Sequence, residues 1–154
     1  MALMEPTTAS TLLTPTHAAS LSSLSLAIQI HLVCALAATA LGPLALWSRK
    51  GSTRHRWSGR VWVLLMIGAA LTSLFIRDFR LPNLGGYTPI HLLPLLTAFG
   101  LTQAIRAILR RDIATHRQTM RSVYIGACLV AGAFTLLPGR YLGDLLWHHA
   151  FGLI

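Results

Sequence analysis

Four apolar stretches alternate with short polar segments along the chain. They cover roughly residues 21–47, 57–76, 90–109 and 118–137. A helix that crosses a bilayer needs about 20 mostly apolar residues, because each residue adds about 1.5 Å along the axis. The pattern therefore predicts an all-α integral membrane protein, in which four transmembrane helices run alternately up and down as one bundle.

The residues before and after these stretches are predicted to be tails. Residues 1–20 are rich in Ser, Thr, Ala and Pro and contain no Lys or Arg, which predicts a flexible polar tail rather than a secretory signal. The transmembrane domain then covers residues 21–138. Residues 139–154 are aromatic and are predicted to lie at the membrane interface.

The cationic residues are concentrated in two of the polar segments. Ten of the 13 Lys and Arg residues lie within segments 49–60 and 106–121, and the other three are Arg77, Arg80 and Arg140. Cytoplasmic loops of membrane proteins carry an excess of Lys and Arg. This distribution therefore predicts that both basic segments lie inside and that both termini lie outside.

The composition agrees with a membrane protein, and the distribution of charge argues against a nucleic-acid-binding protein. Hydrophobic residues make up 54% of the chain and charged residues only 11%, against about 25% charged residues in a typical soluble domain. The net charge of +9 would suit a nucleic-acid-binding protein. Because the cations flank the apolar stretches, we expect anionic lipid rather than nucleic acid as their partner.

Several kinds of active site find no support in the sequence. A proton- or cation-coupled transporter usually keeps a carboxylate within the membrane, whereas all four acids lie outside the predicted spans, at Glu5, Asp78, Asp112 and Asp144. There is no glycine-rich phosphate loop and no serine with a base and an acid partner. No catalytic residue is identified, which leaves open whether the protein is an enzyme.

Each predicted span carries one imidazole near its start or in its first half. By helical rise, His31 lies about 24 Å from the basic end of its span and His91 about 22 Å from Arg106, so both lie toward the outside. His55 and His116 lie within the basic segments, just before the second and fourth apolar stretches, and therefore toward the inside. The spacing predicts two couples on diagonally facing helices, His31 with His91 and His55 with His116.

Four motifs in this order resemble a known family. They are IHLVCAL in the first span, HRWSGRVWV at the start of the second, TPIHLL at the start of the third and HRQTMRSV at the start of the fourth. They resemble the bacterial predicted membrane proteins grouped as domain of unknown function 2306. The resemblance covers most of residues 21–137, and only Thr119, where an aromatic residue is expected, departs from it. It implies a multi-pass protein of the bacterial inner membrane and no particular activity.

Diagonal histidine couples at two depths are similar in pattern to the two-haem transmembrane cytochromes b. Haem iron takes axial imidazole ligands, and helix bundles supply such ligands from facing helices. We therefore expect a small membrane electron carrier with one or two haem b groups. It would pass electrons between a quinone or another membrane donor and an acceptor.

Arginines near the inner couple suit negatively charged groups. Arg54, Arg56, Arg117 and Arg121 are predicted to pair with haem propionates or with anionic lipid headgroups. The inner imidazoles themselves have a second interpretation, as interfacial residues that pack against lipid phosphate. His116 with Met120, on one helix face, is also a possible copper site.

Two further functions fit the same pattern. Small residues recur at helical spacing in the first and fourth spans, and small faces let helices approach closely. The protein would then be a cofactor-free accessory subunit of a larger membrane complex. Alternatively, it would be a carrier or binding protein for a small molecule held in an imidazole-lined cavity.

Overall fold

The computed structural model describes residues 24–76, 89–137, 142–143 and 147, and within these residues it is helical with no strand. The described elements are α1 (Leu26–Trp47), α2 (Thr53–Ser73), the 3₁₀ turn η2 (Pro89–His91), α3 (Leu92–Leu109), α4 (Ile113–Val123), the π-helix η3 (Tyr124–Val130) and α5 (Ala131–Thr135). The predicted N-terminal tail and most of the C-terminal tail lie outside the described residues.

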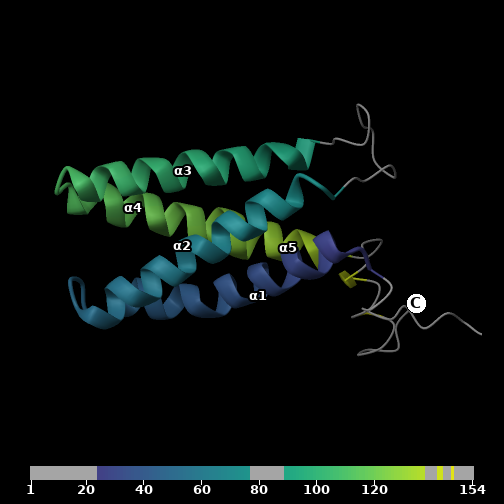
Figure 1. Ribbon diagram of the computed structural model, residues 1–154, viewed down its shortest axis with the longest axis horizontal. Helices are drawn as coiled ribbons and strands as arrows, with labels where there is room; N and C mark the ends of the chain where they lie inside the picture. The colour runs from purple at the N-terminus through teal and green to yellow at the C-terminus, as the bar shows by residue number, and fades with distance from the viewer. Residues whose placement is uncertain (1–23, 77–88, 138–141, 144–146, 148–154) are drawn as a thin grey trace, which may run out of the picture.

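The helices pack in the order in which they follow one another. α1 packs along α2, α2 contacts α3, α3 packs along α4, and η3 returns to α1. The last three segments, α4, η3 and α5, follow one another directly as one helical stretch. Figure 1 shows that the α1–α2 turn and the α3–α4 turn lie at the same end of the molecule.

The second and fourth helices begin before the predicted starts of their spans, because polar residues cap them. The Ser52 side chain accepts a hydrogen bond from the His55 backbone N–H at 3.1 Å, and Asp112 accepts one from the Thr115 N–H at 3.0 Å. A capping oxygen satisfies one of the N–H groups that a helix start leaves without a partner. His55 and His116 therefore lie within the first turns of α2 and α4.

The Asp112 cap responds to pH. Hydrogen bonds from Thr115 lower the pKa of the Asp112 carboxyl group below its ordinary value. A carboxyl whose pKa is lower in the folded state stabilises that state when it is ionised. The cap is therefore complete above the ordinary carboxyl pKa and is lost as the pH falls through the lowered value.

Both inter-helix turns need one residue in the left-handed backbone region. In the first turn that residue is Gly51, at φ 80°. The Ser52 N–H donates a hydrogen bond to Arg49 O across this turn at 3.1 Å. In the second it is Arg111, at φ 60°, where the Asp112 N–H donates to Ala107 O at 2.9 Å. The first bond closes a tight turn with Gly51 as its third residue, and the second ends α3. Both arrangements favour glycine at the left-handed position.

Most buried positions hold small residues, although Trp62, Met66 and Leu101 are also buried, and many other large apolar side chains face outward. Ala38 and Ala104 are fully buried, whereas no large side chain among the described residues is. Exposed large apolar residues occur on all four packed helices, for example Leu36, Leu64, Leu95 and Phe134, each more than half exposed. Soluble monomers rarely expose so much contiguous apolar surface. Of the described helices, α1 and α3 are long and apolar enough to cross a membrane.

One close contact joins the first and last helices. A Cβ at Gly42 would lie 2.1 Å from Cε2 of Tyr124, so only glycine fits beneath this ring. The Tyr124 hydroxyl donates to Thr39 O at 3.1 Å, one turn earlier on α1. Tyr124 is also the first residue of the π-helix, whose wider turn often marks a functional site.

Gly42→Ala is expected to destabilise the protein by about 1–3 kcal/mol, because the methyl group overlaps the Tyr124 ring. Gly59→Ala is the matched control, since nothing lies within 4 Å of a Cβ at Gly59 in α2. That change should stabilise the helix by about 1 kcal/mol through helix propensity alone. Unfolding in mild detergent measures both, and equal effects would contradict the packing described.

Candidate functional site

Three ring side chains connect α1 to α2 through backbone carbonyls. His31 Nδ1 donates to Ala69 O at 2.9 Å, the Trp62 Nε1–H donates to Ala38 O at 3.0 Å, and His55 Nδ1 donates to Ala45 O at 2.9 Å. We call these three bonds the α1–α2 ladder. Each one joins two helices within an apolar surrounding, where a polar group without a partner is costly.

The ladder has a regular spacing. Along α1 its positions are residues 31, 38 and 45, and along α2 they are 69, 62 and 55, so each bond is seven residues from the next. Seven residues are close to two helical turns, so all positions lie on one helix face. Every acceptor is a buried alanine, whose small side chain lets the partner ring approach the carbonyl.

The other two imidazoles make the same kind of bond. His116 Nδ1 on α4 donates to Ala104 O on α3 at 2.9 Å. His91 Nε2 donates to Ile76 O, just beyond α2, also at 2.9 Å. All four half-buried rings therefore bind the backbone carbonyl of a neighbouring segment.

These bonds define the tautomers of the rings. A carbonyl oxygen can only accept a hydrogen bond, so the nitrogen that contacts it carries the proton. In the neutral rings of His31, His55 and His116, the proton is on Nδ1 and the lone pair is on Nε2. His91 has the opposite arrangement, with its Nε2–H on the carbonyl.

The imidazoles lie at separate depths. His31 bonds at Ala69, fourteen residues along α2 from His55, which corresponds to about 21 Å of helical rise. His91 and Ala104, the acceptor for His116, are thirteen residues apart near α3, or about 20 Å. The pairing of His31 with His91 and of His55 with His116 therefore stays a prediction, and the described bonds join each ring to a backbone carbonyl of an adjacent segment.

A comparison with protein families identifies the chain. The family model described as "Predicted membrane protein (DUF2306)" matches residues 28–146. The chain belongs to this family. The match includes all four packed helices and all four imidazoles. Among curated proteins and solved structures, no match was found.

The described histidines of this DUF2306 protein are not gathered into a cluster that could hold a metal ion. Among the described residues, no group of three or more His, Cys, Asp or Glu side chains is gathered to hold a metal ion. A haem iron held by two imidazoles needs only two protein ligands, so this observation does not concern that kind of site.

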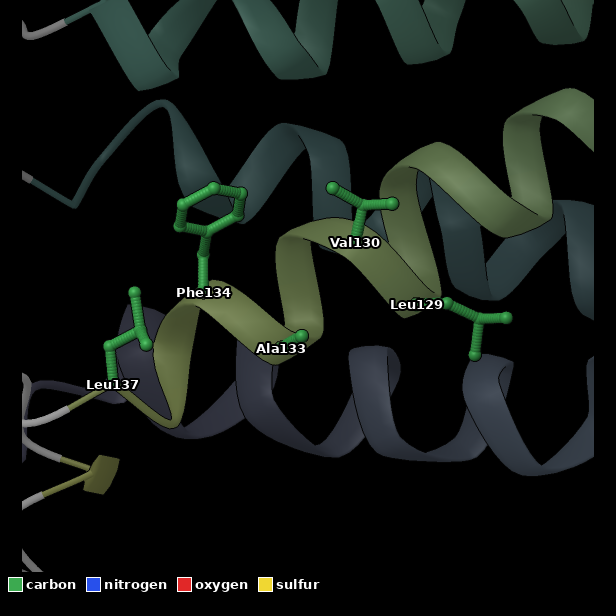
Figure 2. A pocket seen from close by; sticks show the side chains of 5 residues that line it. All are labelled: Leu129, Val130, Ala133, Phe134 and Leu137. Atoms are coloured by element: carbon green, nitrogen blue, oxygen red, sulfur yellow. The ribbon is translucent and has the colours of Figure 1, made fainter.

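A shallow apolar hollow of about 370 Å³ lies on the last helical stretch. Figure 2 shows its lining, which comes from η3, α5 and the residue Leu137 just beyond α5. The lining consists of Leu129, Val130, Ala133, Phe134 and Leu137. Gly126 and Gly132 belong to the same stretch, and nothing lies within 4 Å of a Cβ at either position. Within the described part of the chain, these two positions therefore do not pack closely against another helix.

A cationic cluster lies where the two basic segments meet. Burial and the positive charges of Arg117 and Arg121 lower the pKa of the Lys50 ammonium. Lys50 belongs to the α1–α2 turn and the two arginines belong to α4, so the two helical hairpins bring these charges together. The Lys50 ammonium also donates to Leu46 O at the end of α1.

Some contributors to the site were not predicted from the sequence. Trp62 and Tyr124 donate to α1 carbonyls and lie with their ring centroids 6.4 Å apart. Cys128 Sγ lies 3.5 Å from Met66 Sδ in the core. An aromatic residue in an apolar stretch gives no local signal for such contacts. The seven-residue spacing of His31, Ala38 and Ala45 is the one regularity that could have indicated the ladder.

Trp62→Phe is expected to cost about 1–3 kcal/mol of stability, because the buried Ala38 carbonyl then loses its donor. Trp57→Phe on the same helix is the control, since Trp57 is 63% exposed, and its effect should be within about 0.5 kcal/mol. Unfolding in mild detergent compares the two. Equal losses would show that the Trp62 bond contributes nothing specific.

Proposed function

We propose that this protein is a small haem b electron carrier of the bacterial inner membrane. In this proposal four helices cross the membrane as an up-down bundle, and both termini lie outside. The imidazoles His31, His55, His91 and His116 supply axial ligands for one or two haems. A haem, when bound, supplies one-electron chemistry, and the chain would position it within the apolar bundle.

The membrane placement is supported by the distribution of apolar and basic residues. Large apolar side chains are exposed on all four packed helices and not only on α1 and α3. The two basic turns lie at the same end of the molecule (Figure 1), as expected for the inner side. Lipid would cover the outward side chains, while the polar backbone is satisfied within the helices.

The observation that carries the haem proposal is the tautomer of three imidazoles. A histidine that binds a metal usually donates its other ring N–H to a carbonyl or carboxylate, which sets the ring orientation and raises its basicity. His31, His55 and His116 each make this bond through Nδ1. Nε2 is therefore the nitrogen that would bind iron. His91 fits less well, because its Nε2 donates to Ile76 O and would have to exchange that bond.

Other residues of the chain have roles in the same proposal. Arg54, Arg56, Arg117 and Arg121 lie at the inner end, where they would pair with propionates or lipid headgroups. Trp62 and Tyr124 lie at the middle position of the α1–α2 ladder. Aromatic side chains therefore occupy the level between the two proposed iron positions, which helical rise separates by about 20 Å.

The experiment is an absorption spectrum of protein purified from haem-replete cells. A Soret band and a reduced alpha band are expected. His31→Asn, His55→Asn and His116→Asn should each remove about half of the haem if two groups are bound, or all of it if the residue holds a single group. The Asn amide can replace Nδ1 as the carbonyl donor but is a poor iron ligand.

Trp62→Phe is the matched control for this series, because it removes a carbonyl bond of the same ladder without removing an imidazole. It should keep the full haem content. For His91 the matching change is His91→Gln, whose amide lies nearer the Nε2 position. A colourless and fully helical wild-type preparation would contradict the proposal.

An accessory subunit without a cofactor is the second candidate, and the last helical stretch favours it. The apolar hollow and the unfilled space at Gly126 and Gly132 would accept a helix of a larger membrane complex.

In that case Gly132→Leu should leave the stability of the purified protein within about 1 kcal/mol of wild type, because no atom of the described residues lies within 4 Å of a Cβ at this position. The same change should shift the protein from a high-mass membrane complex to a smaller species on native gels. An unchanged complex would contradict the second candidate.

A further inference from the structure

One side of α2 faces away from the helix on which α2 packs. The buried residues of α2 lie on the side that is bonded to α1, and they are Ser58, Trp62, Met66 and Ala69. Four other residues each precede one of these by two positions, and they are Arg56, Arg60, Leu64 and Ile67. Two residues correspond to about 200° around a helix, so this second set lies on the opposite side.

The second set belongs to a continuous exposed line along α2. Its members follow one another at intervals of three or four residues, which places neighbours on one helix face, and Leu71 continues the series. Arg56 and Arg60 are exposed, and Leu64, Ile67 and Leu71 are 68%, 41% and 56% exposed. We call these five residues the α2 strip. It is basic at the start of the helix and apolar beyond it.

The two arginines of the strip have no acidic partner in the described part of the chain. Asp112 is the one acidic side chain that the structure describes, and its carboxylate caps α4 through the Thr115 N–H. Arginines four residues apart on a helix can reach the same anion. The start of a helix also carries partial positive charge. Charge complementarity therefore favours an anionic group at the basic end of the strip.

The depth of the strip indicates what carries this anion. Trp57 adjoins Arg56 and is 63% exposed, and Trp47, at the end of α1, is 80% exposed. The bond from His55 to Ala45 O holds these two helix ends beside each other. Tryptophan prefers the headgroup level of a bilayer. From Arg60 to Leu71 the strip then rises about 16 Å, which is close to half of the roughly 30 Å hydrocarbon core.

We propose that the α2 strip binds one anionic phospholipid. The lipid phosphate lies on the two arginines, and one acyl chain lies along the three apolar residues. A phosphate offers several acceptor oxygens, and arginine forks match its geometry. A free phosphate would satisfy the arginines but would leave the apolar part of the strip uncovered. The inference rests on the membrane placement in the proposed function, but not on haem.

The test uses full-length protein in neutral detergent, to which phosphatidylglycerol, phosphatidylcholine or inorganic phosphate is added. The unfolding temperature and lipid retention in native mass spectrometry are measured. Phosphatidylglycerol should raise the unfolding temperature and remain bound, whereas zwitterionic phosphatidylcholine and inorganic phosphate should do neither. Arg56→Gln and Arg60→Gln should each weaken phosphatidylglycerol binding about fivefold, as expected for one basic contact.

Arg54→Gln is the matched control, because it removes an exposed positive charge from the same turn of the same helix. Arg54 lies two residues from Arg56 and therefore points to another side of α2. The phosphatidylglycerol affinity of this variant should stay within about twofold of wild type. An equal loss in all three variants would indicate diffuse attraction and overturn the site.

The apolar part of the strip is tested by the length of the lipid chains. Dihexanoyl phosphatidylglycerol has the same headgroup but chains too short to reach Leu71, so it should bind about tenfold more weakly than the dipalmitoyl lipid. Equal binding of the two lipids, or equal stabilisation by inorganic phosphate, would overturn the lipid assignment. A lipid-free dimer that Leu64→Ala disrupts would assign the strip to a second copy of the chain instead.

Failure of this inference can be separated from failure of the proposed function. If alkaline carbonate released the protein from membranes, the membrane placement itself would be wrong. If the protein stayed in the membrane and the two strip variants bound phosphatidylglycerol like wild type, only the lipid site would be wrong. Arg60 has no role in the haem proposal, so the haem spectrum of Arg60→Gln should match that of wild type.

Discussion

Hydrogen bonds from ring nitrogens to backbone carbonyls are the interaction on which the packing of this protein depends. Helices inside a membrane satisfy their own backbone groups, so a second donor to a helical carbonyl needs a side chain from a neighbouring helix. His31, Trp62 and His55 supply three such donors between α1 and α2, and His116 supplies one between α3 and α4. Each bond sets the register of two helices and not merely their proximity.

This interaction explains why the acceptor residues are small. A ring can reach a carbonyl only where the acceptor helix has a short side chain, and each α1–α2 acceptor is a buried alanine. The same requirement recurs at Gly42, where the Tyr124 ring lies directly against the backbone of α1. The large donor rings of Trp62 and Tyr124 are buried against these positions, whereas many other large apolar side chains face outward. Small residues at the acceptor positions therefore follow from this constraint.

The ladder also links structure to the chemistry proposed for the imidazoles. A ring that is anchored through Nδ1 is oriented before any ligand arrives, so less freedom is lost when Nε2 binds one. The same bonds would be useful without a ligand, since they join helices. The Asn and Phe variants separate these two roles, because the Asn variants remove the nitrogen that is proposed to bind iron and the Phe variant removes a carbonyl donor. At the basic end, by contrast, the charges are concentrated by the meeting of two hairpins and oppose one another.

Local sequence patterns were sufficient to predict the helices, their order and the position of an imidazole near the start of each. Apolar length, basic turns and helix caps are properties of neighbouring residues, and the family assignment agrees with them. The direction of each ring was not predictable, because it depends on which carbonyl of another helix lies within reach. The pairing of His31 with His91 and of His55 with His116 stays a prediction, and the described bonds add that each ring contacts a backbone carbonyl of an adjacent segment. The contact between Gly42 and Tyr124 and the approach of Lys50 to Arg117 were likewise decided by tertiary packing, since these residues are far apart along the chain and only the helix crossings bring them together.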